Sequence, residues 1–337
     1  MNAAIVTFSD RGYALGERLT SYFEQSGETA SLTRCVHGRL KEWVKEHFKH
    51  DALIFIGSCG IAVRAVAPFL TSKTSDPAVV VIDEIASCAV SLLSGHIGGA
   101  NELTSRLACF LGAMPVITTA TDVNGVFAID TWAVKHGLRI ANPDRIKWVS
   151  AHLLAGGSIK IECDYPVRGQ LPQGIVLCDK GGDVLITHRM CGCKEALRLV
   201  PPIITLGIGC KKDVNSGTIE CAFELALEKA GCHPLAVARV CSIDLKAREP
   251  GILAFCHRHA LPFKTFLAQE LMAAPGTYTS SAFVKQITGA DNVCERSAVL
   301  GSGDGGRLLI GKDAGNGVTM ALAISPFTIC FDGERKT

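Results

Sequence analysis

The chain has 337 residues, of which 48% are hydrophobic, so it is long and apolar enough for two or three domains with substantial cores. Its formal net charge of +2 argues against a general nucleic-acid binder. Its longest apolar runs fall short of the roughly 18 residues that a membrane-spanning helix needs, and the first ten residues do not resemble a signal peptide. The fifteen cysteines are scattered and form no CxxC pair, which favours small buried thiols in a reducing cytoplasm over a metal framework.

The first fifty residues alternate between strand and helix patterns. Ala3–Phe8 and Ala30–Cys35 are predicted strands, while Tyr13–Gln25 and Leu40–Phe48 are predicted helices. Three further apolar runs follow, and each ends in a loop of small and polar residues; these runs are Ala52–Ile56, Ala89–Leu93 and Val116–Thr119. Repetition of apolar run, glycine loop and helix is typical of a parallel α/β sheet.

In a parallel sheet the loops after the strands gather at one edge, and ligands bind there. We therefore expect the loops 57–60, 94–101 and 120–122 to lie together. Glu84 follows the predicted strand Val79–Ile82 and is expected at the same edge.

The loop 94–101 carries the groups of most chemical interest. Gly98 and Gly99 lack side chains, so backbone N–H groups there can approach a ligand closely. A helix beginning near Ala100 would point its positive end at that ligand and should lower the pKa of His96. The glycines can equally serve as tight turns only, with His96 an exposed loop residue. The pattern does not match GxGxxG or GxxxxGK[ST], so a nucleotide site is weakly supported.

After residue 122 the pattern changes to helices, the first at Asp130–His136, and short strands separated by Pro and Gly. Pro201-Pro202 forms a stiff boundary, after which a strand, the glycine loop Gly207–Lys212 and the helical pattern Thr218–Ala230 follow. The sequence predicts two Rossmann-like α/β domains with mainly parallel sheets, joined by a small α+β middle segment. The expected domains are 1–122, 123–200 and 201–337.

Six blocks of the chain form one recognisable series. They are Gly57–Arg64, Asp76–Glu84, Leu92–Asn101, Pro115–Asp122, Gly207–Cys210 and Ser242–Gly251. This series closely resembles the cobalt-precorrin-5A hydrolase (CbiG) family of anaerobic cobalamin biosynthesis. The first four blocks resemble the N-terminal part of that family, and the last two resemble its C-terminal domain.

The resemblance implies an enzyme that opens the ring A δ-lactone of cobalt-precorrin-5A and releases a two-carbon fragment as acetaldehyde, giving cobalt-precorrin-5B. The substrate would be an anionic cobalt tetrapyrrole. Its macrocycle and cobalt can accept electrons, so no cofactor or metal bound by the protein itself is implied. Such an enzyme would be cytoplasmic, with no nucleic-acid or membrane partner; other cobalamin-pathway enzymes or a second copy of the chain are the macromolecular partners to consider.

Lactone hydrolysis needs an activated water and hydrogen-bond donors for the developing oxyanion. The candidate catalytic residues are His96, Glu84 and Asp122, and either carboxylate would orient the His96 ring through its other nitrogen. The candidate substrate-binding residues are Arg64, Lys73, Ser94, Gly98, Gly99, Asn101, Thr118, Thr119, Lys211 and Lys246. A GxSxG nucleophile elbow is absent from the sequence, which disfavours an acyl-enzyme route of that type.

Two other classes of protein stay open at this point. A non-catalytic carrier or scaffold of the same pathway would need a cationic cleft but no ionisable group near the lactone. A dinucleotide-dependent enzyme would use the loop Gly95–Gly99 and an acidic residue about 20 residues further on, at the end of the next strand, to bind a ribose. Asp122 lies near that distance, but the glycine spacing is wrong.

Overall fold

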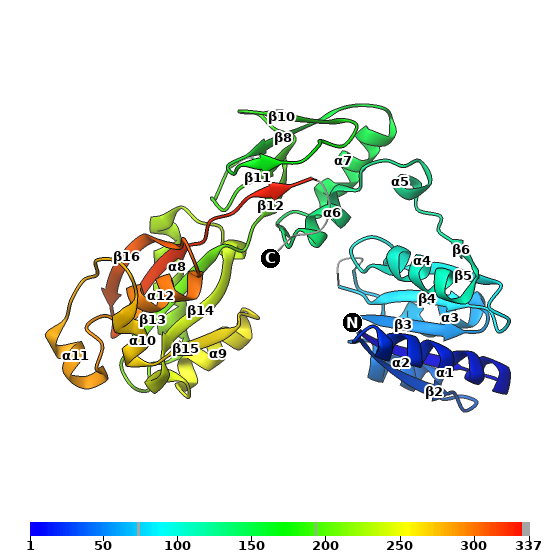
Figure 1. Cartoon of the computed structure of the whole chain (residues 1–337), viewed down its shortest axis with the longest axis horizontal. Helices are drawn as coiled ribbons and strands as arrows, with labels where there is room; N and C mark the ends of the chain where they lie inside the picture. Colours follow the sequence, from blue (N-terminus) through cyan, green and yellow to red (C-terminus); the bar gives the residue numbers. More distant parts are fainter. Residues whose placement is uncertain (73–74, 193, 332–337) are drawn as a thin grey trace. The chain divides into compact units, whose positions relative to one another are not determined.

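The computed structural model describes residues 1–72, 75–192 and 194–331 (Figure 1). The chain divides into two compact units. The first unit comprises Met1–Val134 with Leu153–Gly156, and the second comprises Lys135–His152 with Gly157–Thr337. Their sheets are mainly parallel, which confirms the predicted fold class. The predicted bounds of three domains stay predictions.

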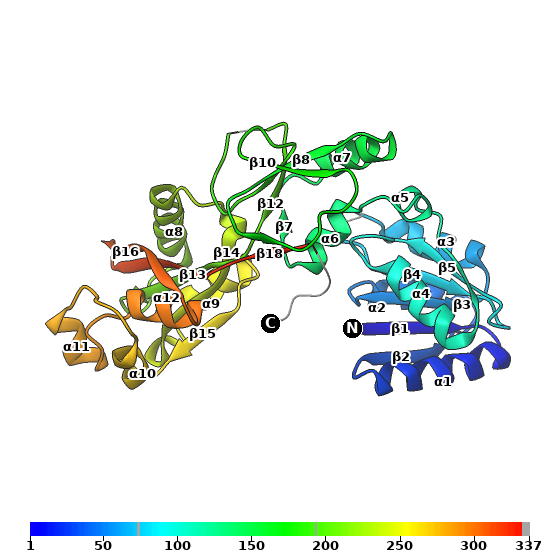
Figure 2. The ribbon, with the colours of Figure 1, turned by 45° about the horizontal axis from the view of Figure 1, so that its top comes forward.

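The first unit contains a six-stranded sheet with the order β2-β1-β3-β4-β5-β6. Its strands are β1 (Asn2–Thr7), β2 (Thr29–Arg34), β3 (Ala52–Ile56), β4 (Ala78–Ile82), β5 (Cys88–Leu93) and β6 (Met114–Val116). The helices from this part of the chain are α1 (Asp10–Gln25), α2 (Leu40–His47), α3 (Cys59–Val66), α4 (Ala100–Leu111), α5 (Ala120–Val123) and α6 (Ile129–Lys135). The blue and cyan part of Figure 2 shows the sheet with its flanking helices.

Helices cover both faces of this sheet, which is why its central strands are apolar at every position. On one face Ile54 packs with Leu19 and Phe23 of α1 and with residues of α4. On the other face Phe55 packs with Trp43 of α2 and with residues of α3. Every residue of β3 and of β4 is buried.

The direction of the sheet reverses at β5. Strands β1 to β4 run parallel to one another, β5 is antiparallel to β4, and β6 is parallel to β5. The carboxyl ends of β5 and β6 therefore lie at the opposite edge from those of β1, β3 and β4. The prediction that the loops 57–60, 94–101 and 120–122 share one edge with Glu84 is wrong, because 57–60 and Glu84 lie at one edge and the other two loops at the other.

The connection between β4 and β5 explains the reversal. It consists of residues 83–87, whereas a crossover between parallel strands takes a dozen or more residues. Asp83 holds this tight turn, because its carboxylate accepts hydrogen bonds from the backbone N–H groups of Ile85, Ser87 and Cys88. Burial opposes the charged form of Asp83, but hydrogen bonds from the side chains and backbone N–H groups of Ser87 and Cys88 outweigh it and hold the pKa of Asp83 well below its usual value.

The second unit contains two five-stranded sheets. The first has the order β10-β8-β11-β12-β7, and the second has the order β15-β14-β13-β17-β16. Their strands are β7 (Arg139–Ile140), β8 (Ile159–Cys163), β10 (Ile175–Cys178), β11 (Val184–Ile186), β12 (Leu197–Val200), β13 (Ile204–Cys210), β14 (Val237–Ile243), β15 (Phe263–Phe266), β16 (Arg307–Gly315) and β17 (Val318–Ile324). The short strands β9 (Val167–Arg168) and β18 (Ile329–Cys330) pair separately.

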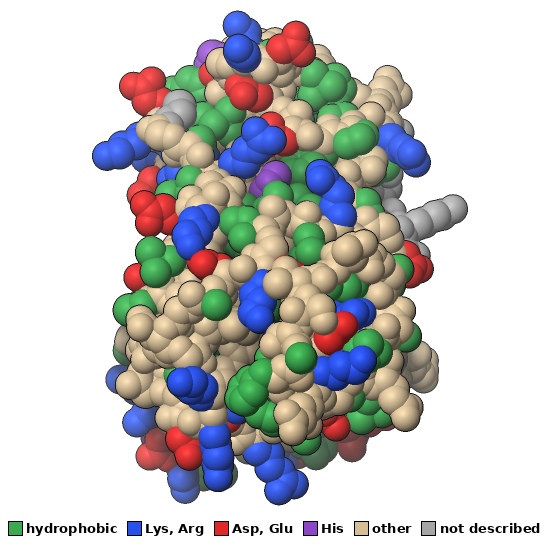
Figure 3. Space-filling view, turned by 90° about the vertical axis from the view of Figure 1, so that its left-hand side faces the viewer, with side chains coloured by type: hydrophobic (Ala, Val, Ile, Leu, Met, Phe, Trp, Pro, Cys, Tyr) green, Lys and Arg blue, Asp and Glu red, His purple; other side chains and the backbone are tan. Residues whose placement is uncertain are grey.

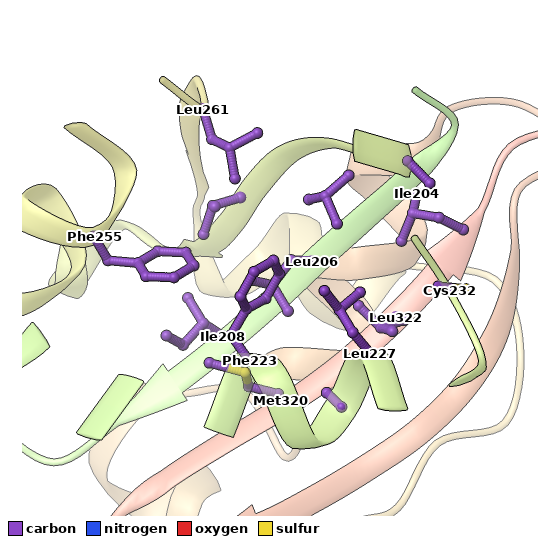
Figure 4. Packing of buried hydrophobic residues seen from close by; sticks show 14 of the residues in the cluster. Ile204, Leu206, Ile208, Phe223, Leu227, Cys232, Phe255, Leu261, Met320 and Leu322 are labelled. Carbon is purple, nitrogen blue, oxygen red and sulfur yellow. The ribbon is translucent and has the colours of Figure 1, made fainter. Parts of the chain in front are cut away.

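Helices complete the second unit, and the first of them ends with two residues that belong to the first unit. They are α7 (Asp144–Leu154), α8 (Ser216–Ala230), α9 (Pro250–Arg258), α10 (Ala268–Ala273), α11 (Ala282–Thr288) and α12 (Cys294–Ser302). Figure 4 shows the core between the C-terminal sheet and its helices, where Leu206, Phe223 and Phe255 lie together.

The predicted glycine loop at Gly207–Lys212 is mainly strand, because β13 continues to Cys210. A Cβ atom on Gly207 would lie 2.8 Å from the backbone nitrogen of Ala298 in α12, and one on Gly209 would lie 2.7 Å from Oγ1 of Thr319. These glycines let a helix and a neighbouring side chain approach the strand closely, so packing accounts for them.

None of the helices in the described ranges combines the length and the apolar character that crossing a membrane requires.

Candidate functional site

Two loops meet at the edge of the first sheet where β5 and β6 end. β5 runs into the loop 94–99 and then into α4, while β6 runs through residues 117–119 into α5. Because β5 and β6 are parallel neighbours, these two connections lie side by side. The arrangement brings His96 from the first connection against α5 from the second.

The loop 94–99 folds tightly on itself, and its glycines make this fold possible. A Cβ atom on Gly95 would lie 2.7 Å from Oδ1 of Asn101, and one on Gly98 would lie 2.9 Å from the carbonyl oxygen of Ser94. Gly99 precedes α4 with a left-handed φ of 80°, and its N–H donates a hydrogen bond to the His96 carbonyl oxygen at 2.9 Å. The Gly99 N–H is therefore engaged within the loop, which leaves the Gly98 N–H as the candidate of the two predicted backbone donors.

Both nitrogens of the His96 ring contact a carboxylate. Nε2 lies 2.9 Å from Oδ2 of Asp122 and 2.9 Å from Oγ1 of Thr121, and Nδ1 lies 3.2 Å from Oδ2 of Asp130. An ionised carboxylate only accepts hydrogen bonds, so both ring nitrogens act as donors and the ring carries a positive charge. The side chains of His96 and Asp130 are 17% and 6% exposed, whereas that of Asp122 is 41% exposed.

These contacts raise the pKa of His96 to about 8, chiefly through the hydrogen bond with Asp130, against the opposing effect of burial and with a further contribution from Asp122. The prediction that the helix terminus would lower the pKa of His96 is wrong, because two carboxylates face the ring directly. Burial disfavours the charged form of Asp130, but the hydrogen bond and charge of His96 outweigh it and lower the pKa of this carboxyl group.

Asn101 connects the parts of the site. Its amide nitrogen donates to Oγ1 of Thr119 at 3.0 Å and to Oδ2 of Asp122 at 2.9 Å, and its amide oxygen accepts from Ser91 at 2.6 Å. Both hydrogens of the amide are thus engaged within the protein, and the side chain is buried. Asn101 holds Asp122 in place, and its predicted role as a donor to substrate is not apparent in this geometry.

Glu84 lies away from this site. It follows β4 at the other edge of the sheet, where its Oε1 accepts a hydrogen bond from Oγ of Ser9 at 2.5 Å. Ser9 also caps α1 by accepting from the N–H of Gly12 at 3.1 Å. Of the two carboxylates predicted to orient His96, Asp122 contacts the ring and Glu84 does not.

The remaining predicted substrate-binding residues are spread over several elements. Ser94 lies in the loop after β5 with a left-handed φ of 56°, Thr118 is exposed before α5, and Arg64 is exposed in the last turn of α3. Lys73 lies outside the described residues. The substrate-binding roles of these residues stay predictions.

The two predicted lysines of the second unit differ in their surroundings. Lys211 is exposed directly after β13. Nζ of Lys246 lies 2.7 Å from Oε2 of buried Glu249, so its charge is already paired. Figure 3 shows Lys and Arg side chains scattered among acidic and hydrophobic ones on one face of the molecule.

Sequence reasoning missed two side chains that touch the His96 ring. Thr121 directly precedes Asp122, a predicted site residue, and this neighbourhood in the sequence was the available signal. Asp130 is 34 residues from His96 and opens a helical pattern, where acidic residues are common for helix-dipole reasons alone. The dinucleotide alternative needed Asp122 at a strand end, but Asp122 lies on α5 and bonds to His96 and Asn101.

The fold and the site define an α/β protein with a histidine held between two carboxylates, an arrangement suited to acid–base chemistry. Three family models match successive parts of the chain: Cobalamin synthesis G N-terminal at residues 42–122, Cobalamin biosynthesis central region at 127–190, and Cobalamin synthesis G C-terminus at 204–323. The chain belongs to this cobalamin synthesis G (CbiG) family.

Two curated relatives, at 37% and 31% identity, agree with this membership. A cobalt-precorrin-5A hydrolase of Salmonella typhimurium is 37% identical, with 96% of this chain and 97% of the relative covered. A cobalt-precorrin-5A hydrolase of Priestia megaterium is 31% identical, with 91% and 87% covered. A solved cobalamin biosynthesis protein G homolog from Sulfolobus solfataricus is 25% identical, with 96% and 97% covered and a TM-score of 0.43.

Proposed function

We propose that this protein opens the ring A δ-lactone of cobalt-precorrin-5A and releases acetaldehyde, giving cobalt-precorrin-5B in anaerobic cobalamin biosynthesis. Family membership and the names of two relatives over nearly the whole chain support this function. The observation that carries the assignment of the site is the His96–Asp122 pair, in which an exposed carboxylate meets a charged ring. Such a pair supplies both a proton acceptor and a proton donor.

In the first step, the Asp122 carboxylate takes a proton from a water molecule whose oxygen attacks the lactone carbonyl carbon. The ring C–O bond then breaks, and the departing oxygen takes a proton from Nε2 of the His96 imidazolium. The Gly98 N–H and the Ser94 hydroxyl are the candidate donors to the oxyanion that forms in between. This step leaves a carboxylic acid, an alcohol, a protonated Asp122 and a neutral His96 ring, and the two acids then release their protons to solvent.

In the second step, neutral His96 takes the proton of the freed alcohol. The alcohol oxygen then forms the carbonyl group of acetaldehyde as the neighbouring carbon–carbon bond breaks, and the electron pair of that bond passes to the macrocycle. The cobalt-bearing macrocycle of the substrate accepts these electrons, so the proposal requires no cofactor from the protein. One ring thus acts first as an acid and then as a base.

The substrate carries several carboxylates, for which exposed Arg64 and Lys211 are the better candidate partners because Lys246 is already paired. Every cysteine that the structure describes is a free thiol, which suits a reducing cytoplasm. Association with other enzymes of the pathway or with a second copy of the chain stays a prediction.

Incubation of the protein with cobalt-precorrin-5A under anaerobic conditions, followed by an acetaldehyde assay, tests the function. Release of acetaldehyde with many turnovers per protein molecule is expected. Binding of the tetrapyrrole without acetaldehyde release would indicate a carrier instead. Activity that depends on added dinucleotide would indicate the third class of protein.

A further inference from the structure

A buried carboxylate closes the His96 site on the side away from solvent. Asp130 stands in the first turn of α6, and its side chain is 6% exposed. One carboxylate oxygen, Oδ1, accepts the N–H of Thr131 at 3.0 Å, and the other, Oδ2, faces Nδ1 of His96 at 3.2 Å. Both oxygens are therefore used within the protein, and Asp130 can act on a substrate through His96 but not directly.

We propose that Asp130 is the positioning residue of the site, which turns Nε2 of His96 toward Thr121 and Asp122 and keeps the ring in the charged form that can give up a proton. This inference rests on the proposed function for its catalytic meaning. It adds a residue to the site that the sequence did not suggest.

The orientation follows from the two ends of the ring. Nδ1 is fixed by a buried group, whereas Nε2 faces Asp122, which is exposed enough to meet a substrate. Without Asp130, one ring nitrogen would have no carboxylate partner, and the ring would be free to turn about its side-chain bonds. A ring held at both nitrogens presents its proton in one direction.

The charge balance follows from the same contacts. The groups that face the ring are the carboxylates of Asp122 and Asp130 and the hydroxyl of Thr121. With a charged ring, the three ionised side chains together carry one negative charge. Replacing Asp130 by a neutral amide removes the buried half of this attraction, so the pKa of His96 should fall toward its ordinary value.

The position of Asp130 also gives the central region a function. The match to the N-terminal family model ends at residue 122, and the match to the central region begins at residue 127. His96 and Asp122 come from the first, and Asp130 comes from the second. The site is thus assembled from two family regions, although the middle segment showed no chemical motif in the sequence.

Asp130→Asn keeps the size and shape of the side chain and tests the inference. We expect kcat to fall by about 10- to 100-fold near neutral pH with little change in KM, and the pH profile of kcat to lose or displace the limb that belongs to His96. Asp83→Asn is the matched control, because Asp83 is another carboxylate engaged by several hydrogen bonds but lies at the opposite edge of the sheet. Its pH profile should match that of the parent.

NMR titration of the His96 ring gives a readout that needs no substrate. We expect the ring of the full-length parent to titrate above the ordinary value, the ring in Asp130→Asn to titrate at a clearly lower pH, and the ring in Asp122→Asn to keep part of the upward displacement. An unchanged His96 titration in folded Asp130→Asn overturns the inference. If that variant does not fold, the parent decides, and a His96 ring that titrates at or below its ordinary pKa in the parent overturns the inference. A parent that releases no acetaldehyde but shows the expected titrations would instead refute the proposed function and leave Asp130 as the group that holds His96.

Discussion

Replacing His96 should remove a pH-dependent part of the stability of the first unit. The pKa of His96 rises from 6.5 to about 8 on folding, a change that corresponds to about 2 kcal/mol. Because the folded state raises the pKa, this stabilisation is fully present below pH 6.5 and is lost as the pH rises through about 8. Partial exposure of the ring makes this figure an upper value.

Urea unfolding of the parent and of His96→Gln at pH 6 and pH 9 measures this contribution. The fluorescence of Trp43 and Trp132, which are both buried in the first unit, reports the transition of that unit once Trp148 of the second unit is replaced by Phe in both proteins. The difference in unfolding free energy between parent and variant should be larger at pH 6 by about 1–2 kcal/mol. His37→Gln changes an exposed histidine before α2 and should show no such dependence. An equal difference at both pH values would show that the carboxylates do not hold the ring in its charged form.

Three further predictions concern turnover and binding. His96→Ala should lower kcat at saturating substrate by roughly 100-fold or more, whereas a rise in KM alone would show that His96 only binds the substrate. Gly98→Ala should lower turnover, because the new Cβ atom would lie 2.9 Å from the Ser94 carbonyl oxygen. Gly60→Ala is the control and should behave as the parent, because the nearest atom to its Cβ would be 3.8 Å away. Equal rates for both variants would show that the shape of the 94–99 loop is unimportant for turnover. Arg64→Ala and Lys211→Ala should weaken binding of a corrinoid analogue at low salt more than Lys246→Ala does, because Lys246 is already paired with Glu249. Unchanged affinity in all three variants would show that these side chains do not bind the substrate.

Sequence patterns were sufficient for elements with one clear signal. The strand Ala52–Ile56 was predicted with its observed bounds, because a short apolar run bounded by polar residues and glycine has few other interpretations. The helix beginning near Ala100 was confirmed as α4. A contact of His96 with either Glu84 or Asp122 was also predicted, and the structure contains the one with Asp122, which joins residues 26 positions apart.

The errors came from relations between elements. Glu84 was placed beside His96 because the strand before His96 was taken as parallel to the strand before Glu84. The five residues between β4 and β5 were too few for a crossover and could have excluded that arrangement. Asp130 was missed because no local pattern shows which of many acidic residues a fold will bury against a histidine. The direction of the His96 pKa was wrong for the same reason, since a carboxylate at hydrogen-bond distance outweighs a helix dipole.

The short stretch between Asp122 and Asp130 has a consequence for how this chain can be recombined with its relatives. Its residues 123–126 fall between two family regions and would be a natural place to join halves of different proteins. Yet the eight-residue separation of the two carboxylates sets where each can meet the His96 ring. A hybrid joined there would keep the His96 site only if the parent that supplies the first carboxylate and the parent that supplies the second hold them at the same positions relative to the ring. The join therefore has to satisfy the geometry of the site as well as that of the backbone.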